Sequence, residues 1–168
     1  MRCGKRWTSS LSCFLCALAS WRLIFRSIVL ALESRPATIH PTMTENEIAK
    51  IIVGAAIEVH RTLGGPGLLE SVYEEALVFE LQQRGLKAEK QVPVPIPYKG
   101  ITLATPLRLD LRVEGLVLVE NKATTEYHSL YEVQLLTYLR LTGLKLGLVI
   151  NFGERYAKDG IHRVVNDL

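Results

Sequence analysis

The sequence predicts an α/β (α+β) protein in which helices flank a mixed β-sheet. Three observations carry this prediction. Apolar residues recur every three or four positions over residues 44–84, which is typical of amphipathic helices. Residues 87–122 then alternate between apolar and polar side chains in several short runs. After a third helical stretch, residues 144–152 form a nearly continuous apolar run, as expected of a strand buried on both faces.

Two helices are expected first, and end signals bound them. Thr44 is the predicted N-cap of the first helix and Glu47 occupies its capping-box position, so this helix should extend to about Leu63. The second helix should cover about 68–84, because Gly85 supplies a C-terminal stop. The apolar stripe of the first helix comprises Ile48, Ile51, Ile52, Ala55, Ala56, Val59 and Leu63. The inward residues expected for the second helix are Val72, Ala76, Leu77 and Leu81.

An edge strand and a hairpin are expected next. Residues 87–98 alternate, but three prolines fall on every second position, and a strand without those N–H donors belongs at the edge of a sheet. A turn at Lys99–Gly100 leads into residues 101–104. Residues 108–122 indicate a hairpin, because two runs rich in Val and Leu flank Gly115.

A third helix and the last strands complete the predicted order. Residues 129–141 have helical periodicity, and Gly143 would end that helix. Residues 144–152 supply the buried strand, and residues 161–165 are expected to add a short final one. The predicted order is therefore two helices, three strands, one helix and one or two strands.

Three charged residues of the hairpin require an explanation. Glu120 and Lys122 must share a face because strand side chains alternate, while Asp110 lies among apolar residues of the first strand. Charges in a half-buried sheet cost free energy unless they are paired, bind metal or reach water. Converging carboxylates suit Mg²⁺ or Mn²⁺, and a nearby ammonium can stabilise the charge on a phosphate, so the set would serve metal-dependent phosphodiester hydrolysis. The alternative is a turn-capping aspartate and a solvent-facing ion pair.

The turn of the hairpin decides whether the two carboxylates can meet. A two-residue turn at Glu114–Gly115 directs Asp110 away from Glu120. A three-residue turn over residues 114–116 places Asp110 opposite Glu120 on the same face. The metal-site hypothesis requires the second register, or a bulge that achieves it.

Charge and cysteine content restrict the classes of function. The net charge of +3 is uneven, because residues 1–35 contain six Lys/Arg and one acid whereas residues 36–168 contain 14 Lys/Arg and 16 Asp/Glu. The basic balance is therefore no argument that the domain binds nucleic acid. All three cysteines also lie in the N-terminal part, so the domain has no disulfide and no Cys-ligated metal, which suits a reducing, cytoplasmic setting.

Residues 1–42 are expected to form an appendage and linker ahead of a domain over residues 43–168. We expect the appendage to be disordered, signal-like or the product of a mis-assigned translation start. Its basic start and apolar run suit a signal peptide, whereas two arginines interrupt the ~20 apolar residues of a membrane helix. We favour a true start at Met43 and expect no stable membrane insertion. The Cys13–Cys16 spacing has no second cysteine pair, which favours chance over metal binding.

Several short motifs follow one another along residues 43–168. Asp110…Glu120-Asn-Lys122 resembles the D…(D/E)-x-K core of the PD-(D/E)XK nuclease superfamily. Gly67-Leu-Leu-Glu70-Ser-Val-Tyr73 resembles the motif that names the GxxExxY proteins, a small bacterial family of that superfamily. The likeness continues over residues 52–61, 91–94, 108–111, 134–139 and 144–152, and it leaves out residues 1–42.

The resemblance implies a restriction-endonuclease-like αβββαβ core, with an extra N-terminal helix. It gives Asp110 and Glu120 metal-ligand roles and Lys122 the catalytic role, with Mg²⁺ or Mn²⁺ as cofactor and DNA or RNA as substrate. Glu70 on the preceding helix and Gln134 on the following helix would join the carboxylates. The resulting expectation is a magnesium-dependent nuclease.

Structural roles compete with these assignments. Glu70 would be favourable near a helix N-terminus without any ligand, and Gln134 could cap a backbone group. Tyr73 and Tyr138 are better explained by packing than by a direct role. His162 is expected to lack partners.

One residue departs from the family pattern. The family usually has an apolar side chain between the acid and the lysine, where this chain has Asn121. That side chain should face away from Glu120, where it either finds a partner or weakens the core.

A second functional hypothesis is a catalytically silent binding module for nucleic acid or a protein partner. It is favoured by the negative net charge of residues 36–168, which contain no basic stretch for binding phosphates. A homodimer formed through the edge strand or the face of the first helix is a further expectation.

Overall fold

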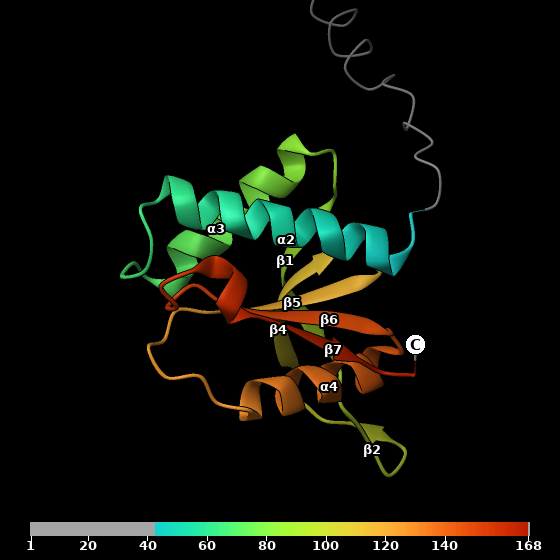
Figure 1. Ribbon diagram of the computed structural model, residues 1–168. Coiled ribbons are helices and arrows are strands. Elements are labelled where there is room, and N and C mark those ends of the chain that lie inside the picture. The colour runs from blue at the N-terminus through green and yellow to red at the C-terminus, as the bar shows by residue number, and fades with distance from the viewer. Residues whose placement is uncertain (1–42, 168) are drawn as a thin grey trace, which may run out of the picture. The chain divides into compact units, whose positions relative to one another are not determined.

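The computed structural model describes residues 43–167, and these residues form a main sheet with helices on both sides and a small separate hairpin (Figure 1). The interpretations of residues 1–42, including the Cys13–Cys16 spacing, lie outside the described residues. The predicted α/β class is confirmed. No helix within residues 43–167 combines the length and apolar character needed to cross a membrane.

The three long helices begin and end close to the predicted positions. They are α2 (Glu45–Thr62), α3 (Glu70–Gln83) and α4 (Leu130–Thr142). The capping box of α2 is formed, since the Glu47 backbone N–H donates to Thr44 Oγ1 at 3.3 Å and the Thr44 N–H donates to Glu47 Oε2 at 2.8 Å. Gly143 ends α4 in the left-handed conformation, with φ of 70°.

Five strands form the main sheet in the order β1-β4-β5-β6-β7. β5 and β6 are parallel, and the other neighbouring pairs are antiparallel. The proline-containing strand β1 lies at an edge, as predicted. The strands are β1 (Ala88–Val94), β4 (Leu107–Val113), β5 (Val117–Lys122), β6 (Leu146–Asn151) and β7 (Ile161–Val165). A separate hairpin pairs β2 (Pro97–Tyr98) with β3 (Ile101–Thr102), and the 3-10 turn η1 (Ala157–Gly160) precedes β7.

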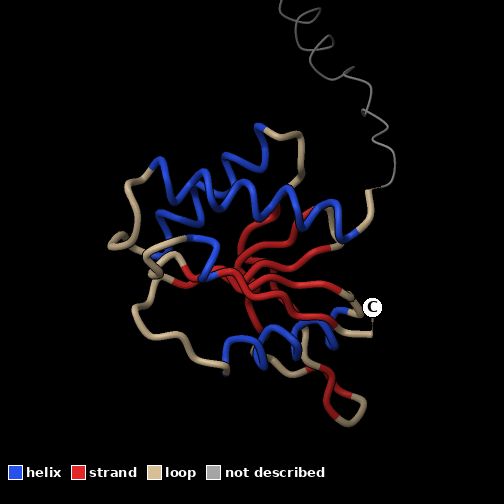
Figure 2. The backbone as a smooth tube through the Cα atoms, in the orientation of Figure 1, coloured by secondary structure: helices blue, strands red, loops and turns tan. Residues whose placement is uncertain are grey.

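The sheet separates two apolar cores. α2 and α3 cover one face and α4 covers the other (Figure 2). All six residues of β6 are buried, which confirms the strand predicted from the apolar run. The stripe of α2 is also buried in the larger core, so this face is not available for the dimer contact that the sequence suggested.

The inward face of α3 agrees with the prediction at Leu77 and Leu81 and differs from it at Val72, whose place Tyr73 takes. Tyr73, Leu77 and Leu81 are fully buried against the sheet, whereas Val72 is 39% exposed. Both sets follow helical spacing, because α3 is apolar on more than one side. Periodicity alone therefore could not tell which stripe faces the sheet.

The β4–β5 hairpin adopts the register that the metal-site hypothesis requires. Val113 pairs with Val117, and the loop between them contains three residues. Glu114 and Gly115 take left-handed conformations, with φ of 52° and 70°. Continuing the register places Asp110 directly opposite Glu120.

Candidate active site

Charged side chains from two strands and one helix meet near the end of β5. Lys122 Nζ lies 2.8 Å from Glu120 Oε1, and Asp110 Oδ2 accepts the Asn121 backbone N–H at 2.9 Å. Glu70, at the start of α3, interacts electrostatically with Lys122 and Asp110. With Glu74, described below, these residues form the charged cluster: Glu70, Glu74, Asp110, Glu120 and Lys122.

The backbone is distorted where Asp110 lies. Leu109 packs in the core under α4 and Leu111 packs in the core under α2 and α3, although period two would place them on one face. On the neighbouring strand, Gln91 has a φ of 51°, a strained value for a residue other than glycine. β4 therefore changes face at Asp110, and its carboxylate rather than a backbone carbonyl accepts the Asn121 N–H.

Glu120 is the most perturbed carboxyl group of the cluster. Burial raises the pKa of Glu120 to about 7, and the Asp110 and Glu70 carboxylates contribute to the rise. The hydrogen bond from Lys122 lowers this pKa without offsetting the other effects. The second oxygen, Oε2, is buried and has no hydrogen-bond partner within the described part of the chain. At neutral pH this group therefore requires a proton or a cation.

Burial also raises the pKa values of the other three carboxyl groups. Lys122 opposes the rise for Glu70 and for Asp110, where the Asn121 N–H opposes it more strongly. The Gln91 amide opposes it for Glu74, while the Asp110 charge adds to the rise. The four acids therefore share one partly dehydrated region in which negative charge is in excess.

Lys122 supplies the positive charge of this region. Burial lowers the pKa of its ammonium, but the Glu120 hydrogen bond and the Glu120, Glu70 and Asp110 charges outweigh this effect, so the net pKa is raised. Lys122 is therefore protonated at neutral pH, and its ammonium lies beside the Glu120 carboxyl group.

Sequence reasoning missed two members of this region. Glu74 is 8% exposed, accepts a hydrogen bond from Gln91 Nε2 at 2.9 Å and lies 3.8 Å from Lys90 Nζ. Gln91 also lies near enough to Asp110 to oppose slightly the rise in the pKa of that carboxyl group. The i, i+4 spacing of Glu70 and Glu74 was a usable signal, because residues so spaced share a helix face. Nothing in the sequence indicated that Gln91 would join them from β1.

The donor set fits a hard divalent cation. Asp110 and Glu120 offer carboxylate oxygens, the buried Glu120 Oε2 has no partner in residues 43–167, and the excess negative charge favours a cation. Within those residues, however, no three His, Cys, Asp or Glu groups are arranged closely enough to enclose an ion. The residues therefore suit an ion that is held by two carboxylates and keeps waters, as Mg²⁺ does.

Gln134 is not brought into the charged cluster by a hydrogen bond. It lies on α4, where its Nε2 donates to the Tyr138 hydroxyl at 2.6 Å. Tyr138 is 5% exposed and packs in the core under α4, in line with the packing role expected from the sequence. A catalytic role for Gln134 stays a prediction from the family resemblance.

Tyr73 positions the start of α3, and thus Glu70. Its ring stacks on Phe152 with a centroid distance of 4.6 Å and an interplanar angle of 3°. Its hydroxyl donates to the Gly65 carbonyl at 2.7 Å and accepts the Leu68 N–H at 3.3 Å. The tyrosine of the Gly-x-x-Glu-x-x-Tyr motif therefore packs in the core and holds the loop before the glutamate.

Two fully buried asparagines lie beside the cluster, and they differ. Asn151 accepts N–H groups of Thr124 and Gly153 at 3.0 Å each and donates to the Thr124 carbonyl at 2.9 Å. Neither polar atom of the Asn121 side chain has a partner within residues 43–167. Asn151 thus fixes the chain that follows Lys122, whereas Asn121 weakens the core.

The prediction that His162 lacks partners is wrong. Its ring stacks on Tyr127 at a centroid distance of 3.9 Å, and its Nδ1 lies 3.7 Å from Glu132 Oε1. These contacts join β7 to the chain around the start of α4. Because they connect positions far apart in the sequence, no local pattern could reveal them.

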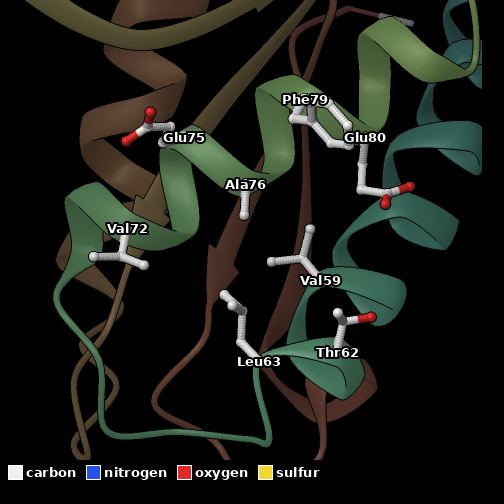
Figure 3. Close-up of a pocket in the computed structure, with 8 residues that line it drawn as sticks. All are labelled: Val59, Thr62, Leu63, Val72, Glu75, Ala76, Phe79 and Glu80. Atoms are coloured by element: carbon white, nitrogen blue, oxygen red, sulfur yellow. The ribbon is translucent and has the colours of Figure 1, made fainter.

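A groove of about 450 Å³ lies between α2 and α3 (Figure 3). Val72, Ala76 and Phe79 form its α3 wall, on a different side of the helix from Glu70 and Glu74. Its lining is mainly apolar and contains no member of the charged cluster. The candidate site is therefore the charged cluster and not this groove.

Comparison with known proteins gives one match. The family model described as the PD-(D/E)XK nuclease superfamily matches residues 46–164. No curated protein and no solved structure matches the chain.

Proposed function

The chain belongs to the PD-(D/E)XK nuclease superfamily, and on this premise we propose that it is a divalent-metal-dependent nuclease that hydrolyses phosphodiester bonds in DNA or RNA. The observation that supports this most is the three-residue hairpin loop between the paired Val113 and Val117, which is the register that the metal-site hypothesis requires.

In this proposal Asp110 and Glu120 hold Mg²⁺ or Mn²⁺. Such an ion supplies Lewis-acid activation of the phosphate and lowers the pKa of bound water. Glu120 contributes the oxygen that has no hydrogen-bond partner among the described residues, and Asp110 is oriented by the Asn121 N–H. Glu70 adds negative charge from the α3 side and helps to orient water.

Lys122 is the proposed catalytic residue. Its ammonium is held next to Glu120 by a 2.8 Å contact, and it is mostly buried, so its charge is weakly screened. In this role the ammonium would orient the attacking water or stabilise charge on the phosphate oxygens. Gln134 has the remaining catalytic role that the family resemblance implies.

Membership of the GxxExxY family is the finer proposal. It is supported by Gly67, Glu70 and Tyr73 at the motif spacing, and by the contacts through which Tyr73 holds the loop that begins near Gly65. The spacing therefore has a structural reason, namely to set the carboxylate at the start of α3 beside the hairpin.

A catalytically silent binding module is the second candidate. The observation that favours it is the absence, within residues 43–167, of three metal-binding groups close together. The Lys122–Glu120 pair also satisfies part of the buried charge without an ion. For the homodimer, the sequence-based proposal now rests on edge strand β1 alone.

A cleavage assay with the full chain tests the enzyme. Labelled DNA and RNA, single-stranded and duplex, are incubated with Mg²⁺ or Mn²⁺ and wild-type protein, Asp110→Asn, Glu120→Gln or Lys122→Met. We expect metal-dependent cleavage that falls about 100-fold or more in each variant. Glu89→Gln is the matched control. Glu89 lies on edge strand β1, its carboxylate pairs with Lys87 and Arg112, and it is not a member of the charged cluster. Cleavage that survives both Asp110→Asn and Lys122→Met would show that the proposed metal-ligand and catalytic roles of these residues are wrong.

A further inference from the structure

Four aromatic rings gather beside Lys122. Tyr127 stacks on His162 at 3.9 Å and meets Tyr131 edge-on at 5.7 Å, and His128 meets Tyr131 edge-on at 5.9 Å. Three of these residues lie in and after the loop between β5 and α4, and His162 lies on β7. We call this group the aromatic cluster: Tyr127, His128, Tyr131 and His162.

Glu132 fixes the orientation of Tyr127 in the aromatic cluster. The Tyr127 hydroxyl donates to Glu132 Oε1 at 3.0 Å, and the same oxygen lies 3.7 Å from His162 Nδ1. The carboxylate therefore holds the Tyr127 ring by a hydrogen bond, and the His162 ring is stacked on Tyr127. Rings that are oriented before a ligand arrives lose little conformational freedom on binding it.

The rings are only partly used in packing. Tyr127, Tyr131 and His162 are half-buried and His128 is exposed. Tyr127 and Tyr131 border the apolar core under α4 without entering it fully. Aromatic surface that stays accessible is able to stack on a planar ligand.

The aromatic cluster is adjacent to the proposed catalytic lysine. Lys122 Nζ lies 5.4 Å from the centroid of the Tyr131 ring. A phosphate that reaches this ammonium therefore brings the base of its own or the next nucleotide close to the rings. The aromatic cluster therefore lies close to the place where the substrate phosphate would bind, and not on a surface remote from it.

The charge of the domain favours a contact that does not depend on phosphate attraction. Residues 36–168 have two more acids than bases, so the net charge of the domain does not attract a polyanion. Stacking of bases on aromatic side chains is the other common source of affinity for single strands, and it depends little on charge.

We propose that the aromatic cluster stacks an unpaired base of the substrate next to the scissile phosphate, so that single-stranded nucleic acid is the preferred substrate class. The substrate class rests on the proposed nuclease function, whereas the binding of an unpaired base is tested without cleavage. A base inside a duplex is already stacked on its neighbours and would have to leave the helix first.

Fluorescence anisotropy with the full chain in EDTA measures the binding directly. Three labelled probes of about 12 nucleotides or base pairs are used: single-stranded oligo-dT, an abasic strand with equal phosphate charge, and a duplex. We expect wild type to bind oligo-dT about five-fold or more tightly than the abasic strand, and more tightly than the duplex. Tyr131→Leu should bring the ratio of oligo-dT to abasic affinity close to one, and Tyr131→Phe should keep it.

Two controls separate stacking from folding. Tyr98→Leu removes an exposed tyrosine from the β2–β3 hairpin and should leave the ratio unchanged. His128→Leu changes an exposed ring and should lower the ratio even where Tyr131→Leu reduces the thermal stability.

The outcomes distinguish this inference from the proposed function. Equal affinity of wild type for oligo-dT and the abasic strand overturns it, as does a ratio that survives both Tyr131→Leu and His128→Leu, which would leave the rings a packing role only. Base-dependent binding without any metal-dependent cleavage would retain the stacking site and remove the nuclease assignment.

Discussion

The first five residues of strand β5 are all buried, but the apolar residues 117–119 and the polar residues 120–121 have opposite chemistry. Val117, Leu118 and Val119 are at most 1% exposed and pack into the two apolar cores. Glu120 and Asn121 are at most 3% exposed, yet each has a polar side-chain atom without a partner in the described residues. The first half stabilises the fold, whereas the second half carries an energetic cost that packing elsewhere must offset.

A comparison of Asn151 with Asn121 shows that burial of a polar side chain near the site does not by itself leave it without hydrogen-bond partners. Asn151 on β6 lies next to Lys122 in the parallel ladder and is as deeply buried as Asn121, but its side chain makes three hydrogen bonds. Buried amides near the site can therefore be fully satisfied. The unsatisfied groups are confined to Glu120 and Asn121 among residues 43–167, which points to a functional reason for the polar half of β5.

The largest expected effect is a loss of cleavage activity in Lys122→Met that is not accompanied by a large loss of stability. Lys122→Met removes the ammonium and should reduce cleavage about 100-fold or more. At pH 6 it should change the free energy of unfolding by only about 1 kcal/mol, because Glu120, whose pKa is about 7 even beside the ammonium, takes up a proton when the ammonium is removed and no buried charge is left uncompensated. Cleavage kinetics and urea unfolding of the same preparation measure both. A variant that loses activity and stability together would contradict the division between the two halves of β5.

Asn151→Ala should have the next largest effect, on stability. It leaves the Thr124 and Gly153 N–H groups and the Thr124 carbonyl without their partner, which should lower the free energy of unfolding by about 2–4 kcal/mol. Urea unfolding monitored by circular dichroism gives the value. A loss below the error of that method would show that water replaces these bonds at no cost.

Stability should fall as pH rises through the titration range of Glu120. The pKa of this group is about 7 in the folded protein against an ordinary value of 4.5, so the folded state binds more protons between these pH values. The free energy of unfolding should therefore drop by about 1–3 kcal/mol from pH 5 to pH 8 without divalent ions. Glu120→Gln should flatten this dependence, and parallel profiles for wild type and variant would refute the role of Glu120.

Asn121→Val should give a smaller effect of opposite sign. It replaces an unpartnered buried amide with an apolar, strand-favouring side chain and should raise the free energy of unfolding by about 1–2 kcal/mol. The thermal midpoint and urea unfolding both measure the gain. A destabilised variant would mean that the amide has a partner after all, such as a bound water.

The sequence predicted the elements whose signals are local. The capping box of Thr44 and Glu47 and the stop at Gly143 mark helix ends without help from the rest of the chain. The hairpin register depended on one turn, and the choice between two stated geometries required the structure.

Contacts between distant segments were outside the reach of local patterns. Gln91 reaches Glu74 across 17 positions, and His162 reaches Tyr127 from another strand. In the inward stripe of α3 only Val72 was misassigned, because the helix has two apolar sides and the sheet beneath it selects Tyr73 over Val72. Family resemblance named the candidate ligands, but it did not indicate that Gln134 would bond to Tyr138.

Calorimetric titration of the full chain with Mn²⁺ at pH 8 tests the central claim most directly, because it asks whether the polar half of β5 holds an ion. We expect wild type to bind Mn²⁺ at millimolar concentration or below, and Asp110→Asn and Glu120→Gln to bind at least about 10-fold more weakly. Wild-type protein that binds no Mn²⁺ at these concentrations, or variants that bind as tightly as wild type, would contradict the account.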